Sequence, residues 1–266
     1  MALNKTNYQA YKKDFNMICM KTTPIFSFII GLLVTANCFG QQARFVSEGK
    51  IEFEKKVNLY SQLNDDDSWT SEIKKNIPQF KVTYFDLSFT DHSTFFQPGR
   101  ENPDNTRLFW QQPAEDNIVY TNLEKHNAIS QKKVFEKTFL VQDSTRKIDW
   151  KITDEKRTIA GFECRRANAV IMDSIYIVAF YTDEITTTGG PESFSGLPGM
   201  ILGLAIPHEH VTWFATKLYA EPVKESSFKI PTKGAKTTNA EMKKELKSGL
   251  KDWGKYGERY IKAALL

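Results

Sequence analysis

Apolar and polar residues alternate along much of the chain, which is the pattern of strands buried on one face. The first such stretch, residues 50–59, turns four apolar side chains to one side: Ile51, Phe53, Val57 and Leu59. Further strands are predicted at residues 80–89, 94–96, 118–120, 134–141, 148–152, 159–172, 175–181, 200–206 and 211–219. These short strands, joined by polar turns, favour an antiparallel meander that is curved or partly closed.

Two predicted strands depart from simple alternation. In residues 80–89 the apolar positions change parity between Tyr84 and Phe85, which predicts a β-bulge. Residues 175–181 are apolar on both faces, which predicts a strand that is central or covered on its second face. Residues 97–117 are polar, contain three prolines and predict a long surface loop.

Helical spacing is found in two places. Residues 69, 73 and 77 recur at helical spacing after Asp65-Asp66-Asp67, which predicts a short helix after the first strand. Near the C-terminus, Thr238 and Glu241 match a capping box, and a long amphipathic helical pattern follows. The predicted fold class is therefore mainly β, a β-rich α+β arrangement with a short early helix and a C-terminal amphipathic helix.

Residues 20–40 have the features of a secretory signal peptide, with a basic start at Lys21 and an apolar run behind it. The run is about half of the ~20 residues that cross a bilayer, so we do not interpret it as an anchor. Cleavage after Gly40 would leave Gln41 as the first mature residue, and residues 1–19 would be an upstream extension. A lipoprotein signal ending at Cys38 is the alternative. Either signal predicts export to the periplasm or the outer membrane.

The predicted organisation is residues 1–40 as upstream extension and signal peptide, 41–230 as a β-rich domain and 231–266 as an amphipathic helical tail. Removing the four Lys and one Asp of residues 1–40 from the chain's 36 basic and 32 acidic residues leaves 32 and 31. This near-neutral balance argues against a nucleic-acid partner. We expect the tail to pack on the sheet, with contact to a membrane surface or a docked partner as alternatives.

Two places carry residues with chemical potential. With cleavage after Gly40, Cys164 is the only remaining cysteine, and its position on one strand face with Phe162 favours a small buried residue over a nucleophile. His208 and His210 would lie on one side of an extended segment and form half of a copper or zinc site. A polar turn is the plainer interpretation of the two histidines, and no cofactor is predicted.

Residues 189–203 contain five glycines and two prolines. Within them, residues 197–200 match a type II turn, because Pro198 presets φ near −65° and Gly199 supplies the positive φ of the next position. Ser193 and Ser195 lack the flanking glycines of a nucleophilic serine turn. The glycines therefore indicate turn geometry rather than chemistry.

This stretch resembles the signature of the GLPGLI family of bacterial envelope proteins, a resemblance carried by Gly196, Leu197, Pro198 and Gly199. Residues 51–55, 150–167 and 181–185 are also similar to the family pattern, in the expected order. The pattern has Trp where this chain has Phe180, and it has Leu where this chain has Met200, a swap that conserves volume. The resemblance implies no established activity, catalytic residues or cofactor.

Together these observations predict an exported, non-enzymatic envelope protein that binds a ligand or accompanies an outer-membrane protein. A small apolar ligand inside the curved sheet would be the natural occupant. One alternative is a periplasmic hydrolase whose acid and base carboxylates are scattered along the sequence. The other is a metal-handling protein that uses His208 and His210.

Overall fold

A computed structural model describes residues 45–63, 68–105, 108, 110 and 112–266, all of which belong to the unit Phe45–Leu266. The predicted signal peptide, Cys38 and Asp65-Asp66-Asp67 lie outside the described residues. Their interpretation stays a prediction from the sequence.

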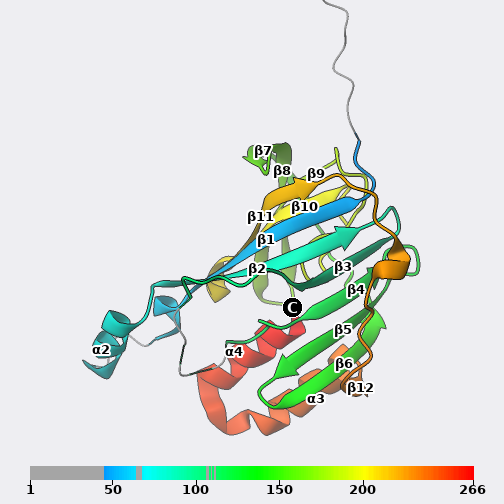
Figure 1. Cartoon of the computed structure of the whole chain (residues 1–266). Helices are drawn as coiled ribbons and strands as arrows, with labels where there is room; N and C mark the ends of the chain where they lie inside the picture. The colour runs from blue at the N-terminus through cyan, green and yellow to red at the C-terminus, as the bar shows by residue number, and fades with distance from the viewer. Residues whose placement is uncertain (1–44, 64–67, 106–107, 109, 111) are drawn as a thin grey trace, which may run out of the picture. The chain divides into compact units, whose positions relative to one another are not determined.

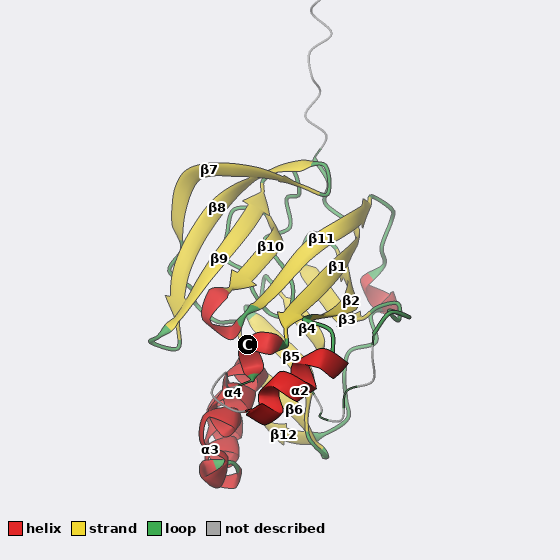
Figure 2. Cartoon of the chain, turned by 90° about the vertical axis from the view of Figure 1, so that its left-hand side faces the viewer, coloured by secondary structure: helices red, strands yellow, loops and turns green. Residues whose placement is uncertain are grey.

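The described residues form one open sheet of 12 strands, which curves around an apolar interior (Figures 1 and 2). The spatial order is β12-β6-β5-β4-β3-β2-β1-β11-β10-β9-β8-β7. Neighbouring strands are antiparallel except β12 and β6, which pair in parallel. The strands are β1 (Gly49–Asn58), β2 (Phe80–Phe89), β3 (Ser93–Pro98), β4 (Ile118–Asn122), β5 (Asn127–Val134), β6 (Lys137–Ser144), β7 (Lys151–Ile159), β8 (Phe162–Ile171), β9 (Ile175–Thr182), β10 (Met200–Ile206), β11 (Val211–Tyr219) and β12 (Ala235–Thr237). The predicted mainly β fold with a curved sheet is confirmed, whereas the sheet is open rather than partly closed, and the parallel pair β12–β6 makes it mixed rather than purely antiparallel.

The predicted early helix is present as α2 (Ser68–Asn76). The tail forms α3 (Asn239–Gly249) and α4 (Gly254–Leu265), joined by the 3-10 turn η5 (Lys251–Trp253). Both hydrogen bonds of the predicted capping box are made between Thr238 and Glu241. The helical pattern is interrupted because Gly254 takes a φ of 52°, which breaks the helical run. Among the described residues, no helix has the length and apolarity needed to cross a bilayer.

The β-bulge predicted in β2 is wrong. The pairing of β1 with β2 runs without a register shift from Gly49 opposite Phe89 to Asn58 opposite Phe80. The parity changes because both faces of a regular strand carry aromatic residues. On the outer face the Arg100 guanidinium lies 3.4 Å from the Tyr84 ring centroid, whereas Phe85 is buried on the inner face.

Several further segments differ from their predictions. The strand predicted at residues 134–141 is divided, because the chain turns at Phe135, with a φ of 54°, between the end of β5 and the start of β6. The strand predicted at residues 148–152 overlaps only the start of β7. Most of the strand predicted at residues 159–172 is present as β8, but it begins only at Phe162. Ala160 and Gly161 take positive φ values, 50° and 88°, and reverse the chain between β7 and β8. The predicted surface loop at residues 97–117 is partly internal, since Gln112, Ala114 and Asn117 are buried. Its polar groups therefore need partners inside the protein.

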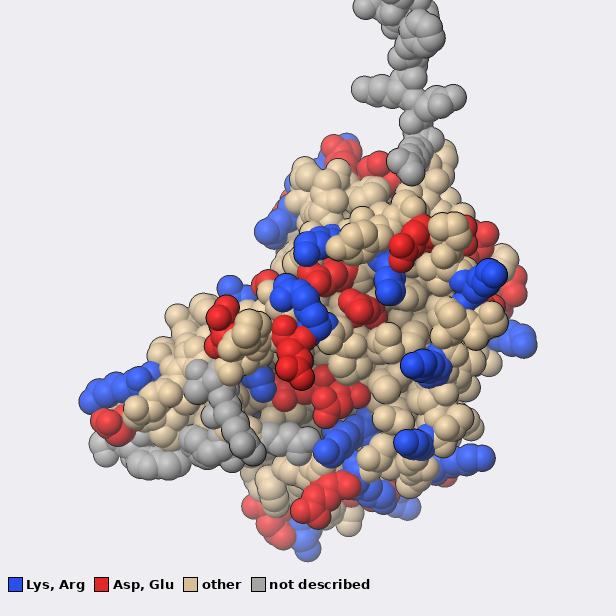
Figure 3. All heavy atoms as spheres, viewed as in Figure 1, with Lys and Arg blue, Asp and Glu red and all other residues tan. Residues whose placement is uncertain are grey.

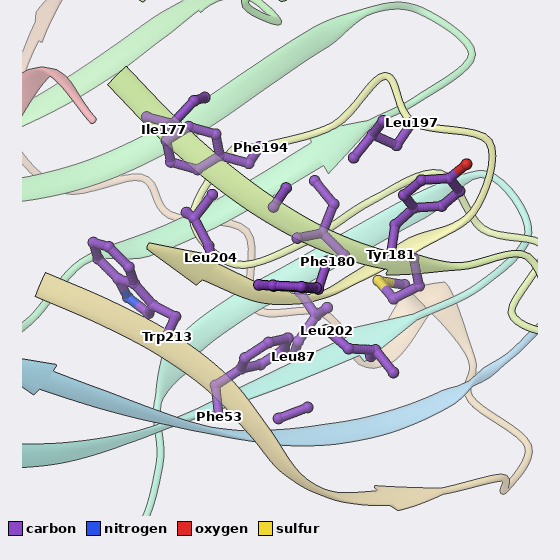
Figure 4. Close-up of a cluster of buried hydrophobic side chains, with 14 of the residues drawn as sticks. Phe53, Leu87, Ile177, Phe180, Tyr181, Phe194, Leu197, Leu202, Leu204 and Trp213 are labelled. Atoms are coloured by element: carbon purple, nitrogen blue, oxygen red, sulfur yellow. The ribbon is translucent and has the colours of Figure 1, made fainter. Parts of the chain in front are cut away.

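The main core lies on the inner face of the sheet (Figure 4). Phe53 and Leu87 meet side chains of β9, β10 and β11 there, and Phe194 and Leu197 are inserted from the Gly/Pro stretch before β10. This insertion covers β9, so seven of its eight residues are buried and the strand predicted to be covered on both faces is confirmed.

A second apolar cluster joins the tail to the opposite end of the sheet. Met242 and Leu246 of α3, with Ile261 and Leu265 of α4, pack against residues of β5 and β6. Figure 2 shows α3 and α4 beside this end of the sheet. The apolar face of the tail is thereby used in packing, which is the arrangement expected for a helical segment that needs a surface to be stable.

Candidate functional site

The Gly/Pro stretch before β10 is held tightly against β9. Gly199 takes a φ of 141°, and a Cβ atom added there would lie 2.0 Å from the carbonyl oxygen of Thr182. The Gly199 N–H donates to the carbonyl oxygen of Leu197 at 2.8 Å, which closes a three-residue turn. The predicted positive φ is present, but the predicted type II turn is wrong because close packing on β9 sets the geometry.

Further contacts anchor this stretch on both sides. The Thr187 hydroxyl donates to the carbonyl oxygen of Thr90 at 2.9 Å, and the Trp150 indole N–H donates to that of Ser195 at 3.0 Å. Leu197 is buried in the core, whereas Gly196 and Pro198 are exposed. The motif Gly196-Leu197-Pro198-Gly199 therefore covers the edge of the core with the Leu197 side chain. It places no reactive group in a cleft.

Glu192, in the same stretch, is buried and takes a left-handed φ of 55°. Its Oε2 accepts a hydrogen bond of 3.0 Å from the Asn117 amide, whereas its Oε1 has no hydrogen-bond partner. Two buried lysines, Lys55 of β1 and Lys132 of β5, feel the attraction of this carboxylate. We call Lys55, Lys132 and Glu192 the interior charge cluster.

Each lysine of the interior charge cluster holds a separate segment. Lys55 Nζ donates to the carbonyl oxygen of Ala114 at 2.6 Å, and Lys132 Nζ donates to that of Ala264 at 2.8 Å. Burial lowers the pKa of Lys55, and it lowers the pKa of Lys132 to about 8, while Glu192 opposes both changes. Lowered lysine pKa values are also found at catalytic sites. Whether a substrate could reach these lysines therefore distinguishes a catalytic role from a structural one.

The cavity beside Lys55 and Glu192 is too small for a substrate. It measures about 40 Å³ and is lined by Lys55, Glu192 and Trp213, whose indole Nε1 also lacks a hydrogen-bond partner. Such a volume holds a few water molecules at most, whereas ligand sites usually exceed about 300 Å³. Lys132 also lines a wider groove that is described below, but its Nζ is engaged by the Ala264 carbonyl oxygen. The prediction of a ligand cavity inside the curved sheet is therefore not met at this place, and the cluster serves to tie segments together.

Cys164 lies in the main core, and burial raises the pKa of its thiol to about 12. A thiol in this state is a poor nucleophile at neutral pH. Its surroundings are those of a packing residue.

His208 and His210 lie at the turn between β10 and β11. The segment is a 3-10 turn, η3 (Pro207–Glu209), and His210 has a left-handed φ of 52°, so the predicted extended geometry is wrong. Both imidazoles are exposed. Within the described ranges, no group of three or more His, Cys, Asp or Glu side chains is placed to hold a metal ion.

One pair of carboxylates, on β1 and β2, could serve as the acid and base that the hydrolase alternative requires. Glu52 and Asp86 face each other across the two strands. Partial burial would raise the pKa of Glu52, but hydrogen bonds from Thr216 and Arg100 lower it, whereas burial raises the pKa of Asp86. Neither residue lines the cavity above or the grooves described below. The face in Figure 3 carries interspersed acidic and basic side chains.

A mostly apolar surface groove of about 440 Å³ lies between α2 and α4. Six apolar or aromatic residues line what we call the aromatic groove: Leu63, Ile73, Trp110, Trp253, Tyr256 and Tyr260. Trp253 and Tyr256 are 49% and 54% exposed, which is unusual for side chains of their size. Gln62, Asp252 and Arg259 add a few polar groups. An apolar lining with sparse polar groups is typical of ligand sites.

Sequence reasoning missed most of these residues. Lys55 and Lys132 occupy inward-facing positions of their strands, so a lysine that interrupts the apolar parity was the available signal. Glu192 gave no such signal. Trp253 and Tyr256 fall within the amphipathic helical pattern predicted for the tail, but they lie on either side of the break at Gly254 and are exposed.

The comparisons with known proteins extend this picture only slightly. Residues 169–203 match the model of a family described as "Protein of unknown function (Porph_ging)". The matched residues include the end of β8, all of β9, the Gly/Pro stretch and the start of β10. A search of curated proteins finds no match. The stretch that holds Glu192 and Gly199 is thus similar to part of a family whose function is unknown.

Several solved structures align with this chain, among them the three that follow. One structure of PNGF-II aligns with a TM-score of 0.49 at 13% identity over 74% of this chain, and another with 0.48 at 12% over 72%. An uncharacterized conserved protein from Thermus thermophilus aligns with a TM-score of 0.38 at 3% identity, covering 73% of this chain and 92% of that one. The aligned part spans about a third of the PNGF-II chain, 32% and 31% in the two structures.

Proposed function

We propose that the protein is an exported, non-enzymatic binding protein of the bacterial cell envelope, of the GLPGLI type. The predicted signal peptide and the resemblance of residues 196–199 to the family signature support export and family. The single observation that carries the binding function is the aromatic groove between α2 and α4.

The proposed ligand is a small, mostly apolar molecule. A volume of about 440 Å³ lies within the range of small-molecule sites, roughly 300 to 1,000 Å³, and is narrow for a folded partner. The exposed rings of Trp253 and Tyr256 offer flat apolar surfaces to such a molecule. Arg259, which donates to the Gln112 side chain at 3.3 Å, places a polar group at the groove and would orient a ligand with one polar end.

Native mass spectrometry of the protein recovered from its own cell envelope tests this function. We expect a small apolar molecule that stays bound to the wild type and is lost from the Trp253→Ser/Tyr256→Ser variant. Tyr219→Ser is the matched control, because Tyr219 is equally exposed on β11 and lies outside the groove. Retention of the molecule by the double variant, or recovery of a bound outer-membrane protein in its place, would overturn the proposal.

Export is tested separately by sequencing the amino terminus of the envelope-bound protein. We expect it to begin at Gln41. Recovery of intact residues 2–40 on a cytosolic species would contradict the export part of the proposal and leave the binding test unaffected.

A further inference from the structure

Two more grooves run along the other side of α4. They measure about 500 and 540 Å³ and share Met172, Lys243 and Leu265 as lining residues. The second groove is lined by Glu258, Ile261 and Leu265, which lie on the opposite face of α4 from Tyr256 of the aromatic groove. We call these two joined grooves the basic trough.

Positive charge is concentrated in the basic trough. The first groove has four basic residues and one acidic residue: Lys132, Arg146, Lys147 and Lys243, with Asp143. The second also has four and one: Lys243, Lys247, Lys251 and Lys262, with Glu258. The whole chain is close to balance, with 36 basic and 32 acidic residues. The trough is therefore far more basic than the protein around it.

The basic residues divide into two sets by what they contact. The first set has partners within the protein, and it includes Lys262, whose Nζ lies 3.1 Å from Glu209 Oε1 in an ion pair. Lys132 and Arg146 donate to the carbonyl oxygens of Ala264 and Leu265, so they secure the end of α4. Lys243 and Lys247 are exposed on α3 and lie four residues apart, which places them on one side of that helix. Lys251, in η5, is also exposed and lines the second groove. This second set is available to an anionic ligand.

The one acidic residue of the first groove is already engaged. Asp143 Oδ2 accepts hydrogen bonds from the Asn239 backbone N–H at 3.0 Å and from the Asn239 amide at 3.2 Å. Its charge is thus directed at the start of α3, where a negative charge is favourable. It opposes an anion at Lys243 and Lys247 only weakly.

The floor of the basic trough is apolar. Met172 and Leu265 run through both grooves, and Ile175, Leu250 and Ile261 extend the floor of the second. A bare anion such as phosphate would contact the lysines and leave this floor exposed to water. A ligand that covers both surfaces gains from apolar burial, at about 25 cal/mol per Å², as well as from charge.

We propose that the basic trough binds an anionic amphiphile, a molecule with an acidic head group and an apolar chain. The head group contacts Lys243, Lys247 and Lys251, and the chain lies along Met172 and Leu265. This site is separate from the aromatic groove, because the two occupy opposite faces of α4.

Three probes separate charge from apolar contact: dodecyl phosphate, inorganic phosphate and dodecyl maltoside, each titrated calorimetrically below its micelle concentration. We expect dodecyl phosphate to bind at least ~10-fold more tightly than either of the others. If inorganic phosphate binds as tightly as dodecyl phosphate, the apolar chain adds nothing to binding. The site would then be a simple anion site, and the amphiphile proposal would be wrong. Equal binding of dodecyl maltoside, or no binding of dodecyl phosphate, would also overturn the proposal.

Variants locate the site. Lys243→Glu/Lys247→Glu should weaken dodecyl phosphate binding by ~10-fold or more, because it reverses two charges on the trough. The matched control is Lys125→Glu/Lys151→Glu, which makes the same change in net charge at exposed positions outside the trough and should change binding less than twofold. If both double variants weaken dodecyl phosphate binding equally, the effect comes from net charge alone, and the assignment of the site to the basic trough is wrong.

Two single substitutions complete the test. Met172→Gln keeps side-chain length but makes the floor polar, so it should weaken dodecyl phosphate binding while leaving that of inorganic phosphate unchanged. Tyr256→Ser, in the aromatic groove, should leave dodecyl phosphate binding unchanged. If Tyr256→Ser abolishes that binding, the amphiphile occupies the aromatic groove and the proposal is wrong. Thermal melting of each variant confirms that it is folded.

Discussion

Lys132 Nζ donates a hydrogen bond of 2.8 Å to the carbonyl oxygen of Ala264, which joins β5 to the last turn of α4 across 132 residues of sequence. The final carbonyls of a helix have no partner within the helix and carry its negative end. A buried ammonium group satisfies one of them here. Arg146 makes the equivalent contact with Leu265. The buried Lys132 and the partly buried Arg146 therefore dock α4 onto the sheet.

The Lys132 contact predicts a specific dependence of stability on pH. Burial lowers the pKa of Lys132 to about 8, whereas the ordinary lysine value is 10.5. Between these pH values the unfolded chain binds more protons than the folded one, so the free energy of unfolding should rise with pH. The rise should be on the order of 1 to 3 kcal/mol larger in wild type than in Lys132→Met. Urea unfolding at pH 7.5 and pH 10 measures this difference. An equal change in the free energy of unfolding for the two proteins would contradict the prediction.

Removing the charge of Glu192 should destabilise the protein through the lysines that it neutralises. Glu192→Gln keeps the side-chain shape and the strained φ of 55°, so only the charge changes. We expect a loss of roughly 2 to 4 kcal/mol in the free energy of unfolding, because Lys55 and Lys132 then stay buried without the carboxylate that attracts both of them most strongly.

A double-mutant cycle checks the origin of this loss. In a Lys55→Met background the same Glu192→Gln change should cost about 1 to 3 kcal/mol less. Simple additivity of the two substitutions in urea unfolding would show that Glu192 acts without Lys55.

Gly199→Ala should be one of the most damaging small substitutions in the chain. The new Cβ would lie 2.0 Å from the Thr182 carbonyl oxygen, at a φ of 141° that side chains rarely adopt. We expect a loss of at least ~2 kcal/mol in the free energy of unfolding. Gly249→Ala is the control, since a Cβ there meets nothing within 4 Å and alanine favours the helix by up to ~1 kcal/mol. Similar melting temperatures for the two variants would refute the packing explanation.

Cys164 should resist chemical labelling while the protein is folded. Burial raises its thiol pKa to about 12, so the reactive thiolate is scarce at pH 8, and the core excludes the reagent. Incubation with iodoacetamide followed by peptide mapping should show little modification of Cys164 in buffer and full modification in urea. Rapid labelling in buffer would show that the thiol is accessible and would reopen its assignment as a nucleophile.

Features that follow from local periodicity and local hydrogen bonding could be predicted from the amino-acid order. Alternation in residues 50–59 predicted the buried face of β1, and apolar residues on both faces of residues 175–181 predicted a covered strand. The capping box at Thr238 and Glu241 could also be predicted, because both of its hydrogen bonds join residues three apart. These patterns do not depend on which strands become neighbours.

The tertiary structure alone decided which polar groups share the interior. Lys55, Lys132 and Glu192 lie on three distant segments, and only the order and curvature of the strands bring their charges within reach of one another. The turn at Gly199 likewise depends on its packing against Thr182 of β9. The break at Gly254 follows from the positive φ of that residue. Periodicity reports which side of a strand faces the core, whereas the partners of a buried charge depend on contacts across the whole sheet.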